Sequence, residues 1–290
     1  MRTASYFSPR FSEAKTQFLE LRKSELRNST LQGVYKPSLN NFQSLSGDKA
    51  IGSYSPLDIQ QFIQLRLKTV SPTTVNIELR SIKSFGRWLL SMDMLPEKNA
   101  FTRIKQLRLE EKPIRFLTKE EFQRVLEAEH SDFWKCFYKV AVLSGIRLSA
   151  LLALKWQDVD LDNATITLQA STSKTKRTHL LPLNLELIPT FKTLQNPKHI
   201  YVFQKPSAVV PVSYDKCYVS RRFHQTCKNV GLDFGFHCLR KSFACWALES
   251  TDNIFAVSKL LTHSSVVTTE KFYARFNQKQ LAEVMARVNL

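Results

Sequence analysis

Residues 144–168 have the sequence SGIRLSALLALKWQDVDLDNATITL, and within them the spacing of the apolar side chains changes. Arg147 follows a Gly turn and begins a stretch whose apolar residues recur as on one face of a helix. Residues 159–168, VDLDNATITL, instead contain two short strand-like runs on either side of the turn pair Asp162-Asn163, and residues 178–183, THLLPL, form a third. The segment therefore predicts a small antiparallel sheet that follows a helix.

Helical patterns surround this sheet in the second half of the chain. Thr118-Lys119-Glu120-Glu121 has the T-x-x-E pattern of a capping box, which predicts that an amphipathic helix begins there. A second helix is expected over residues 133–143, FWKCFYKVAVL, and helical spacing returns from Ser213 onward. The second half is thus predicted to be mainly helical with one small sheet.

Residues 1–107 carry helical patterns only. Ser55-Pro56 and Ser71-Pro72 each combine a capping Ser with Pro at the first helical position. The polar stretch 108–115, RLEEKPIR, contains Pro113 and is interpreted as a linker between two domains. After Ser71 one face of the expected helix is apolar, formed by Val75, Leu79, Ile82, Phe85 and Trp88.

The opposite face of this helix carries Asn76, Arg80, Lys83 and Arg87. Two interpretations remain open. A charged helix face is usually solvated, but on a basic protein it can equally contact the phosphate backbone of DNA.

The whole chain is strongly basic, with a net charge of +17 and a pI of about 9.8. Lys and Arg outnumber Asp and Glu by 18 to 10 in residues 1–112 and by 24 to 15 in residues 113–290. Such a surplus attracts polyanions, and nucleic acid is the first candidate. An anionic membrane surface is the second, but no amphipathic anchor supports it.

The cysteines and the absence of a long apolar run suggest a cytoplasmic location. Five Cys without a CxxC pair fit free thiols in a reducing compartment and argue against a disulfide framework or a zinc site. The first residues, MRTASYFSPRF, lack the apolar core of a signal peptide, and no segment approaches the ~20 apolar residues of a membrane span.

Four local patterns contain residues suited to phosphate chemistry: SGIRLSALLAL, STSKTKR, HCLR and LLTHSSVVTTEKFYARF. Considered singly, each has an ordinary explanation as a helix cap, an exposed turn, a structural His–Arg pair on one helix face, or a packing aromatic. The residues concerned are Arg147, Lys174, His237, Arg240, His263 and Tyr273.

The order of the four patterns resembles the tyrosine recombinase (phage integrase) family, which includes the Xer recombinases. SGIRLSALLALKWQDVDL is similar to the family segment T-G-x-R-x-x-E-L, and LQASTSKTKRTHLLPL to its β-hairpin ending in V-P-L. FHCLRKSFACWAL is similar to H-x-L-R-H-[ST]-F-A-T, and LLTHSSVVTTEKFYA to L-G-H-S-S…T-T…Y. Four motifs in one order make a chance match very improbable. The resemblance covers residues 116–277, and the N-terminal half is similar in helical pattern only.

The resemblance implies a mainly α fold in two domains. Residues 1–107 would form a helical, SAM-like core-binding domain that contacts DNA, and residues 108–115 the linker. Residues 116–290 would form an α+β catalytic domain with a small antiparallel sheet, the DNA breaking-rejoining fold, ending in a tail helix.

The implied activity is site-specific DNA recombination or integration. The phenol of Tyr273 would attack a phosphodiester, leaving a 3′-phosphotyrosine and a free 5′-hydroxyl, and the stored bond energy would make ATP unnecessary. Arg147 and Arg240 would stabilise the developing negative charge with fixed, forked donors. His237 and His263 would each add a hydrogen bond or move a proton.

A flexible hairpin Lys would protonate the leaving 5′-oxygen, with Lys174 the first candidate and Lys176 the alternative. With two Arg clamps, such a site is expected to need no metal and no other cofactor. Further DNA contacts are expected from Arg80, Lys83, Lys176, Arg177 and Lys241.

The expected partner is a double-stranded DNA recombination site, bound by a synaptic tetramer that exchanges strands through a Holliday junction, with accessory proteins possible. Residues 277–290, NQKQLAEVMARVNL, have helical apolar spacing. This tail is predicted either to pack on its own domain or to dock onto a neighbouring protomer.

The sequence departs from the family pattern at several positions. Ala150 replaces an acidic residue three positions after Arg147, Thr262 replaces the usual Gly before His263, and Lys241 stands where His is frequent. Tyr273 follows His263 by ten residues instead of the commoner nine, and Phe272 occupies the ninth position. Two alternatives therefore stay open: a non-catalytic DNA-binding protein on the same fold, and a type IB-like topoisomerase.

Overall fold

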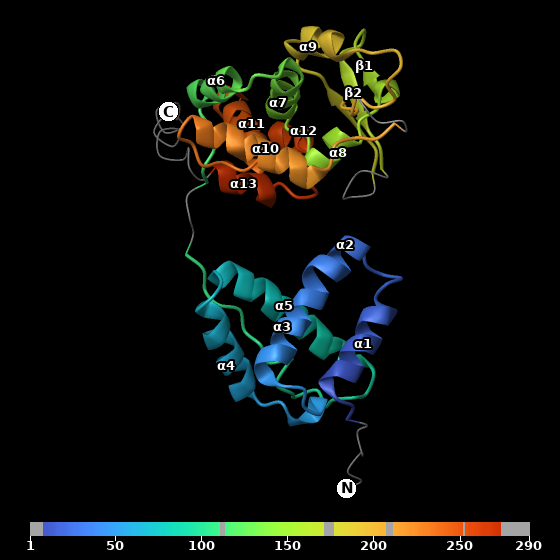
Figure 1. Ribbon diagram of the computed structural model, residues 1–290, viewed down its shortest axis with the longest axis vertical. Helices are drawn as coiled ribbons and strands as arrows, with labels where there is room; N and C mark the ends of the chain where they lie inside the picture. The colour runs from blue at the N-terminus through green and yellow to red at the C-terminus, as the bar shows by residue number, and fades with distance from the viewer. Residues whose placement is uncertain (1–7, 111–113, 171–176, 207–210, 252, 274–290) are drawn as a thin grey trace, which may run out of the picture. The chain divides into compact units, whose positions relative to one another are not determined.

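The computed structural model of the chain describes residues 8–110, 114–170, 177–206, 211–251 and 253–273 (Figure 1). The chain divides into two compact units, Met1–Glu111 and Lys112–Leu290. No helix in the described ranges is long and apolar enough to span a bilayer.

The described part of the first unit is helical, as the sequence predicts. Ser55 and Ser71 cap their helices, each hydroxyl accepting the backbone N–H three residues on. The elements are α1 Phe11–Leu21, α2 Asn28–Thr30, the π-helical turn Leu31–Tyr35, α3 Lys36–Ser46, the 3-10 turn Ile51–Ser53, α4 Pro56–Leu67 and α5 Pro72–Ser91.

Aromatic rings dominate the core of this unit. Phe11 from α1 contacts Phe42 from α3 and Phe85 from α5, with ring centroids 5.3 and 5.1 Å apart. Phe101, from the segment after α5, packs against Phe42 and Tyr54. Since aromatic side chains each bury a large apolar area, these contacts hold three helices around one centre.

The prediction that the polar side chains of α5 form an accessible face is wrong for Asn76. Asn76 is buried, because its side chain bonds both backbone groups of Leu107: Nδ2 donates to the carbonyl at 2.9 Å and Oδ1 accepts from the N–H at 2.7 Å. Lys83 Nζ donates to the carbonyl of Ile104 at 2.9 Å. The chain after α5 folds back over this face, and only Arg80 and Arg87 remain exposed there.

Gly86 permits a close approach within this core. A Cβ placed on Gly86 would lie 2.2 Å from Cβ of Phe101, a distance that real atoms do not tolerate. Phe101 is fully buried, so it has no room to withdraw.

We therefore expect Gly86→Ala to lower the free energy of unfolding of the first unit by about 1–3 kcal/mol through overpacking, although Ala is the better helix former. Urea denaturation measures the change. Gly33→Ala is the matched control, because a Cβ there meets nothing within 4 Å. Equal stability of the two variants would contradict the packing argument.

The second unit is mainly helical around a small sheet, which confirms the predicted fold class. Thr118 forms the predicted capping box with Glu121 at the start of α6. The helices are α6 Lys119–Ala128, α7 Asp132–Ser144, α8 Leu148–Leu152, the 3-10 turn Trp156–Asp158, α9 Leu187–Leu194, α10 Lys216–Asn229, α11 His237–Thr251, α12 Ile254–Leu260 and α13 Val267–Tyr273.

The three predicted strands are present. Val159–Asp160 (β1), Thr165–Leu168 (β2) and His179–Pro182 (β3) form an antiparallel sheet in the order β1-β2-β3. Ile166 lies opposite Leu181, and both point into the core. Of the basic turn expected between β2 and β3, residues 171–177, only Arg177 is described, because residues 171–176 lie outside the described ranges.

Helix α11 is the central helix of this unit and packs against α7, α12 and α13 (Figure 1). The segment before α6 is also attached to it: the Ser242 hydroxyl accepts from the N–H of Leu117 at 2.9 Å, and Trp246 Nε1 donates to the Leu117 carbonyl at 3.1 Å. Helix α11 is therefore fixed both by the helices around it and by the segment before α6.

Candidate active site

Arg147 is positioned by the turn that joins α7 to α8. Gly145 ends α7 with a φ of 61°, a left-handed conformation in which Gly avoids a Cβ clash, here also with the ring of Phe243. Arg147 then occupies the N-cap of α8, where its backbone carbonyl accepts the N–H of Ala150 and of Leu151. The backbone does the capping, so the half-buried guanidinium is available for other contacts.

His237 and Arg240 lie one turn apart at the start of α11. The Arg240 side chain is buried, and its Nη1 donates to the carbonyl of Gly145 at 2.7 Å. Its Nη2 donates to the carbonyl of Leu261. Two backbone carbonyls from distant segments therefore fix the guanidinium in one orientation.

The turn after α12 contributes to the site with three consecutive residues. The Leu261 carbonyl accepts from Arg240, and the Thr262 hydroxyl accepts from Nη1 of Arg147 at 2.8 Å. His263 follows, with Nδ1 of its ring 2.8 Å from the hydroxyl of the buried Thr269.

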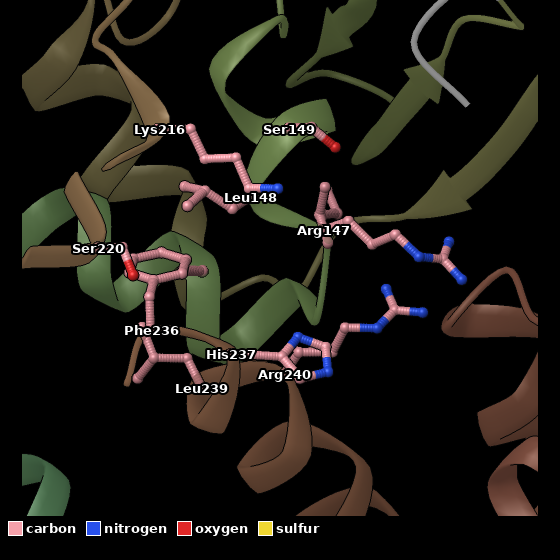
Figure 2. Close-up of a pocket in the computed structure, with 11 residues that line it drawn as sticks. Arg147, Leu148, Ser149, Lys216, Ser220, Phe236, His237, Leu239 and Arg240 are labelled. Atoms are coloured by element: carbon pink, nitrogen blue, oxygen red, sulfur yellow. The ribbon is translucent and has the colours of Figure 1, made fainter. Parts of the chain in front are cut away.

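Figure 2 shows the guanidinium groups of Arg147 and Arg240 extending toward the same side, with the His237 ring beside Arg240. All three residues line a pocket of about 290 Å³. His263 is close enough that the charges of both Arg residues lower its pKa. Four of the six predicted site residues, drawn from three separate segments, are thus brought together.

The assembled site carries an excess of positive charge. Desolvation lowers the pKa of Arg147, and desolvation followed by the charge of Arg147 lowers the pKa of Arg240 to about 9. Both guanidinium groups remain protonated at neutral pH, and no carboxylate within the described ranges lies in an ion pair with either of them. The charge of an arriving anion would favour the protonated form of both guanidinium groups and so oppose these shifts, which makes the site suited to a phosphate group.

The two His rings respond to the same environment. Desolvation, and then the charges of Arg240 and Arg147, lower the pKa of His263 to about 4. Desolvation and the charge of Arg240 also lower the pKa of His237, although this side chain keeps an exposed face. Both rings are therefore neutral at pH 7, when each can donate one hydrogen bond and accept another.

The other predicted site residues are less fully placed. Lys174 and Lys176 lie outside the described residues. Tyr273 is the last residue of α13, which packs against both α11 and α12, and the description covers its backbone only. Arg177 is exposed, and Lys241 is half-buried on α11.

Lys216 was not identified from the sequence. It begins α10 and lines the same pocket as Arg147 and His237 (Figure 2), and its charge contributes to the lowered pKa of His237. The only local signal is Asp215, a helix cap directly before it, and a cap does not indicate what the next side chain faces.

Residues 115–280 match the model of the phage integrase family. The chain belongs to this family. The match includes the segments that supply Arg147, His237, Arg240 and His263, so the phage integrase assignment rests on the same part of the chain as the site geometry.

Curated relatives and solved structures agree with the phage integrase assignment. The chain is 24% identical to tyrosine recombinase XerC of Psychromonas ingrahamii, over 86% of this chain and 87% of the relative. It is 26% identical to tyrosine recombinase XerA of Pyrococcus furiosus, over 90% and 91%.

The fold is shared with solved structures of integrases, for example the following two. One is a lambda integrase tetramer bound to a Holliday junction, with a TM-score of 0.79 and 17% identity over 92% of this chain and 78% of that one. The other is the Tn1549 transposon integrase in complex with a circular intermediate DNA, with a TM-score of 0.78 and 18% identity over 96% and 99%.

The lowered pKa of His263 gives a pH prediction. An unfolded His binds a proton below about pH 6.5, whereas His263 in the fold stays neutral down to about pH 4. The resulting stabilisation is complete above about pH 6.5 and is lost as the pH falls toward 4. We expect roughly 1 kcal/mol to be lost between pH 7 and pH 5, an amount reduced by solvent screening of a half-exposed ring.

His263→Gln should lose less stability over this interval, because Gln does not titrate. Urea denaturation of both proteins at the two pH values makes the comparison. An equal loss in both would show that the His263 ring titrates normally.

Proposed function

We propose that this phage integrase is a site-specific DNA recombinase that cuts and rejoins duplex DNA through a covalent bond to Tyr273. The observation that carries the proposal is the pair of fixed guanidinium groups, Arg147 and Arg240, that converge without a carboxylate partner among the described residues. A pair of permanently charged, forked donors suits the non-bridging oxygens of a phosphodiester.

The proposed reaction begins with the Tyr273 phenol oxygen attacking the scissile phosphorus. The bond from phosphorus to the 5′-oxygen breaks, and a 3′-phosphotyrosine remains. Lys174, with Lys176 as the alternative, gives a proton to the leaving 5′-oxygen. A 5′-hydroxyl from a partner strand later attacks the phosphotyrosine and releases the phenol, so each step exchanges one phosphoester for another without ATP or a metal ion.

The surrounding groups support the transition state. Arg147 and Arg240 offset the charge that develops on the non-bridging oxygens, and their anchoring means that they need not reorganise during reaction. The neutral rings of His237 and His263 donate hydrogen bonds to the phosphate, and either can accept the phenol proton. Arrival of the anion raises their pKa values toward the range useful for proton transfer.

We further propose that both units hold the DNA, with contacts from Arg80, Lys83, Arg177 and Lys241. Arg80 and Arg177 are exposed, so their guanidinium groups are free to reach the DNA backbone. Lys83 already donates to the Ile104 carbonyl and would contact DNA only with its remaining hydrogens. By analogy with the lambda integrase tetramer on a Holliday junction, recombination would proceed in a tetramer through such a junction. The predicted tail, residues 277–290, lies outside the described residues.

A covalent-complex assay tests the chemistry. A binding site is selected from a random duplex pool and rebuilt as a set of suicide substrates, nicked at each position in turn. The wild-type protein should form a complex that survives denaturation, and Tyr273→Phe should bind the same DNA without forming it, because Phe lacks the nucleophilic oxygen.

Binding without a covalent complex by the wild type would favour a non-catalytic DNA-binding protein. Relaxation of a supercoiled plasmid lacking the selected site would favour a type IB-like topoisomerase.

DNA affinity should depend strongly on salt. Each neutralised phosphate releases counterions, so raising NaCl from about 50 to about 200 mM should weaken binding by a factor on the order of 10³. Fluorescence anisotropy with the selected duplex measures this. Arg80→Gln should weaken binding and reduce the steepness of the salt dependence, and an affinity that is independent of salt would refute the phosphate contacts.

A further inference from the structure

Thr262 has a backbone conformation that its side chain disfavours. Its φ is 50°, in the left-handed region, and it is buried. A β-branched residue is rarely found there, because its side chain crowds its own backbone. Strain of this kind persists where the surrounding structure requires it, and it often marks a functional position.

The turn itself explains why the φ is positive. The N–H of Thr262 donates to the carbonyl of Lys259 at 2.9 Å, and the N–H of His263 donates to the carbonyl of Ser258 at 3.0 Å. These two bonds form a Schellman motif at the end of α12, and Gly is the usual residue at the position that Thr262 occupies. The same turn also directs the Leu261 carbonyl toward Arg240. It places the His263 ring in the site, near both Arg residues.

The Thr262 side chain has a contact that Gly could not make. Its hydroxyl accepts from Nη1 of Arg147 at 2.8 Å, across 115 residues of sequence. The residue one helical turn beyond Arg147 is Ala150, which has no polar group to serve as an alternative anchor. Arg240, by comparison, is held by two backbone carbonyls.

From these observations we infer that Thr262 is a positioning residue that holds the Arg147 guanidinium in place for the phosphate. The inference rests on the proposed recombinase function. The strained conformation is retained because the hydroxyl is needed beside Arg147, and the hydrogen bond takes the role of an anchor where Ala150 offers none. A hydroxyl suits this role because it orients the guanidinium without neutralising its charge.

Three substitutions separate the hydroxyl from the strain. Thr262→Val keeps the shape and the strain but removes the acceptor, Thr262→Ser keeps the acceptor, and Thr262→Gly removes both the acceptor and the strain. Thr193→Val is the matched control, because the Thr193 hydroxyl on α9 is exposed and bonds only the Pro189 carbonyl.

The measurement is the first-order rate of covalent complex formation on the suicide duplex at saturating protein, together with DNA affinity and melting temperature. We expect Thr262→Val and Thr262→Gly to cleave about 10-fold more slowly than the wild type, which corresponds to losing one hydrogen bond to a charged group. Thr262→Ser should cleave within about twofold of the wild type, and Thr193→Val should be unchanged. DNA affinity should stay nearly constant, because it is spread over many phosphates.

Thr262→Gly gives the readout that a purely structural role would not produce. Its melting temperature should equal or exceed that of the wild type, since Gly relieves the left-handed strain, while its cleavage rate falls. Cleavage by Thr262→Gly and Thr262→Val at the wild-type rate would overturn the inference. If the wild type itself formed no covalent complex, the proposed function would fail instead, so the two failures are distinguishable.

Discussion

The buried guanidinium of Arg240 joins the ends of two helices in the second unit. Its two hydrogen bonds reach Gly145, at the end of α7, and Leu261, at the end of α12. Both carbonyls lie in turns, where helix hydrogen bonding has ended and acceptors would otherwise lack partners. One side chain therefore donates a hydrogen bond to a backbone carbonyl at each of two helix ends. Its position depends on both turns being formed.

The same arrangement explains the electrostatics of the site. Burial disfavours the charged form of Arg240, and the charge of the nearby Arg147 disfavours it further. For the same reasons the pKa values of Arg240 and His263 are lowered. The fold thus holds a set of donors that a phosphate would stabilise, which is the preorganisation that phosphoryl transfer requires.

The turn at Leu261–His263 shows how local geometry and function are combined in three residues. The Schellman motif requires a left-handed residue, and that residue determines where the flanking Leu261 carbonyl and the His263 ring point. With Gly at this position the turn would form more easily. With Thr it forms under strain and gains a hydroxyl beside Arg147.

The sequence by itself determined the helix starts at Ser55, Ser71 and Thr118, the three short strands, and the order of motifs that identifies the family. The helix starts and strands depend on neighbours within about four residues, through capping, apolar spacing and turn chemistry. Only the tertiary structure decided which polar residues are buried and what they contact. The sequence left open whether Asn76 is solvated or contacts DNA, contained no motif for Lys216, and marked Thr262 only as a departure from the family pattern. Their partners lie tens to more than a hundred residues away, and such contacts follow from packing, which local sequence patterns do not encode.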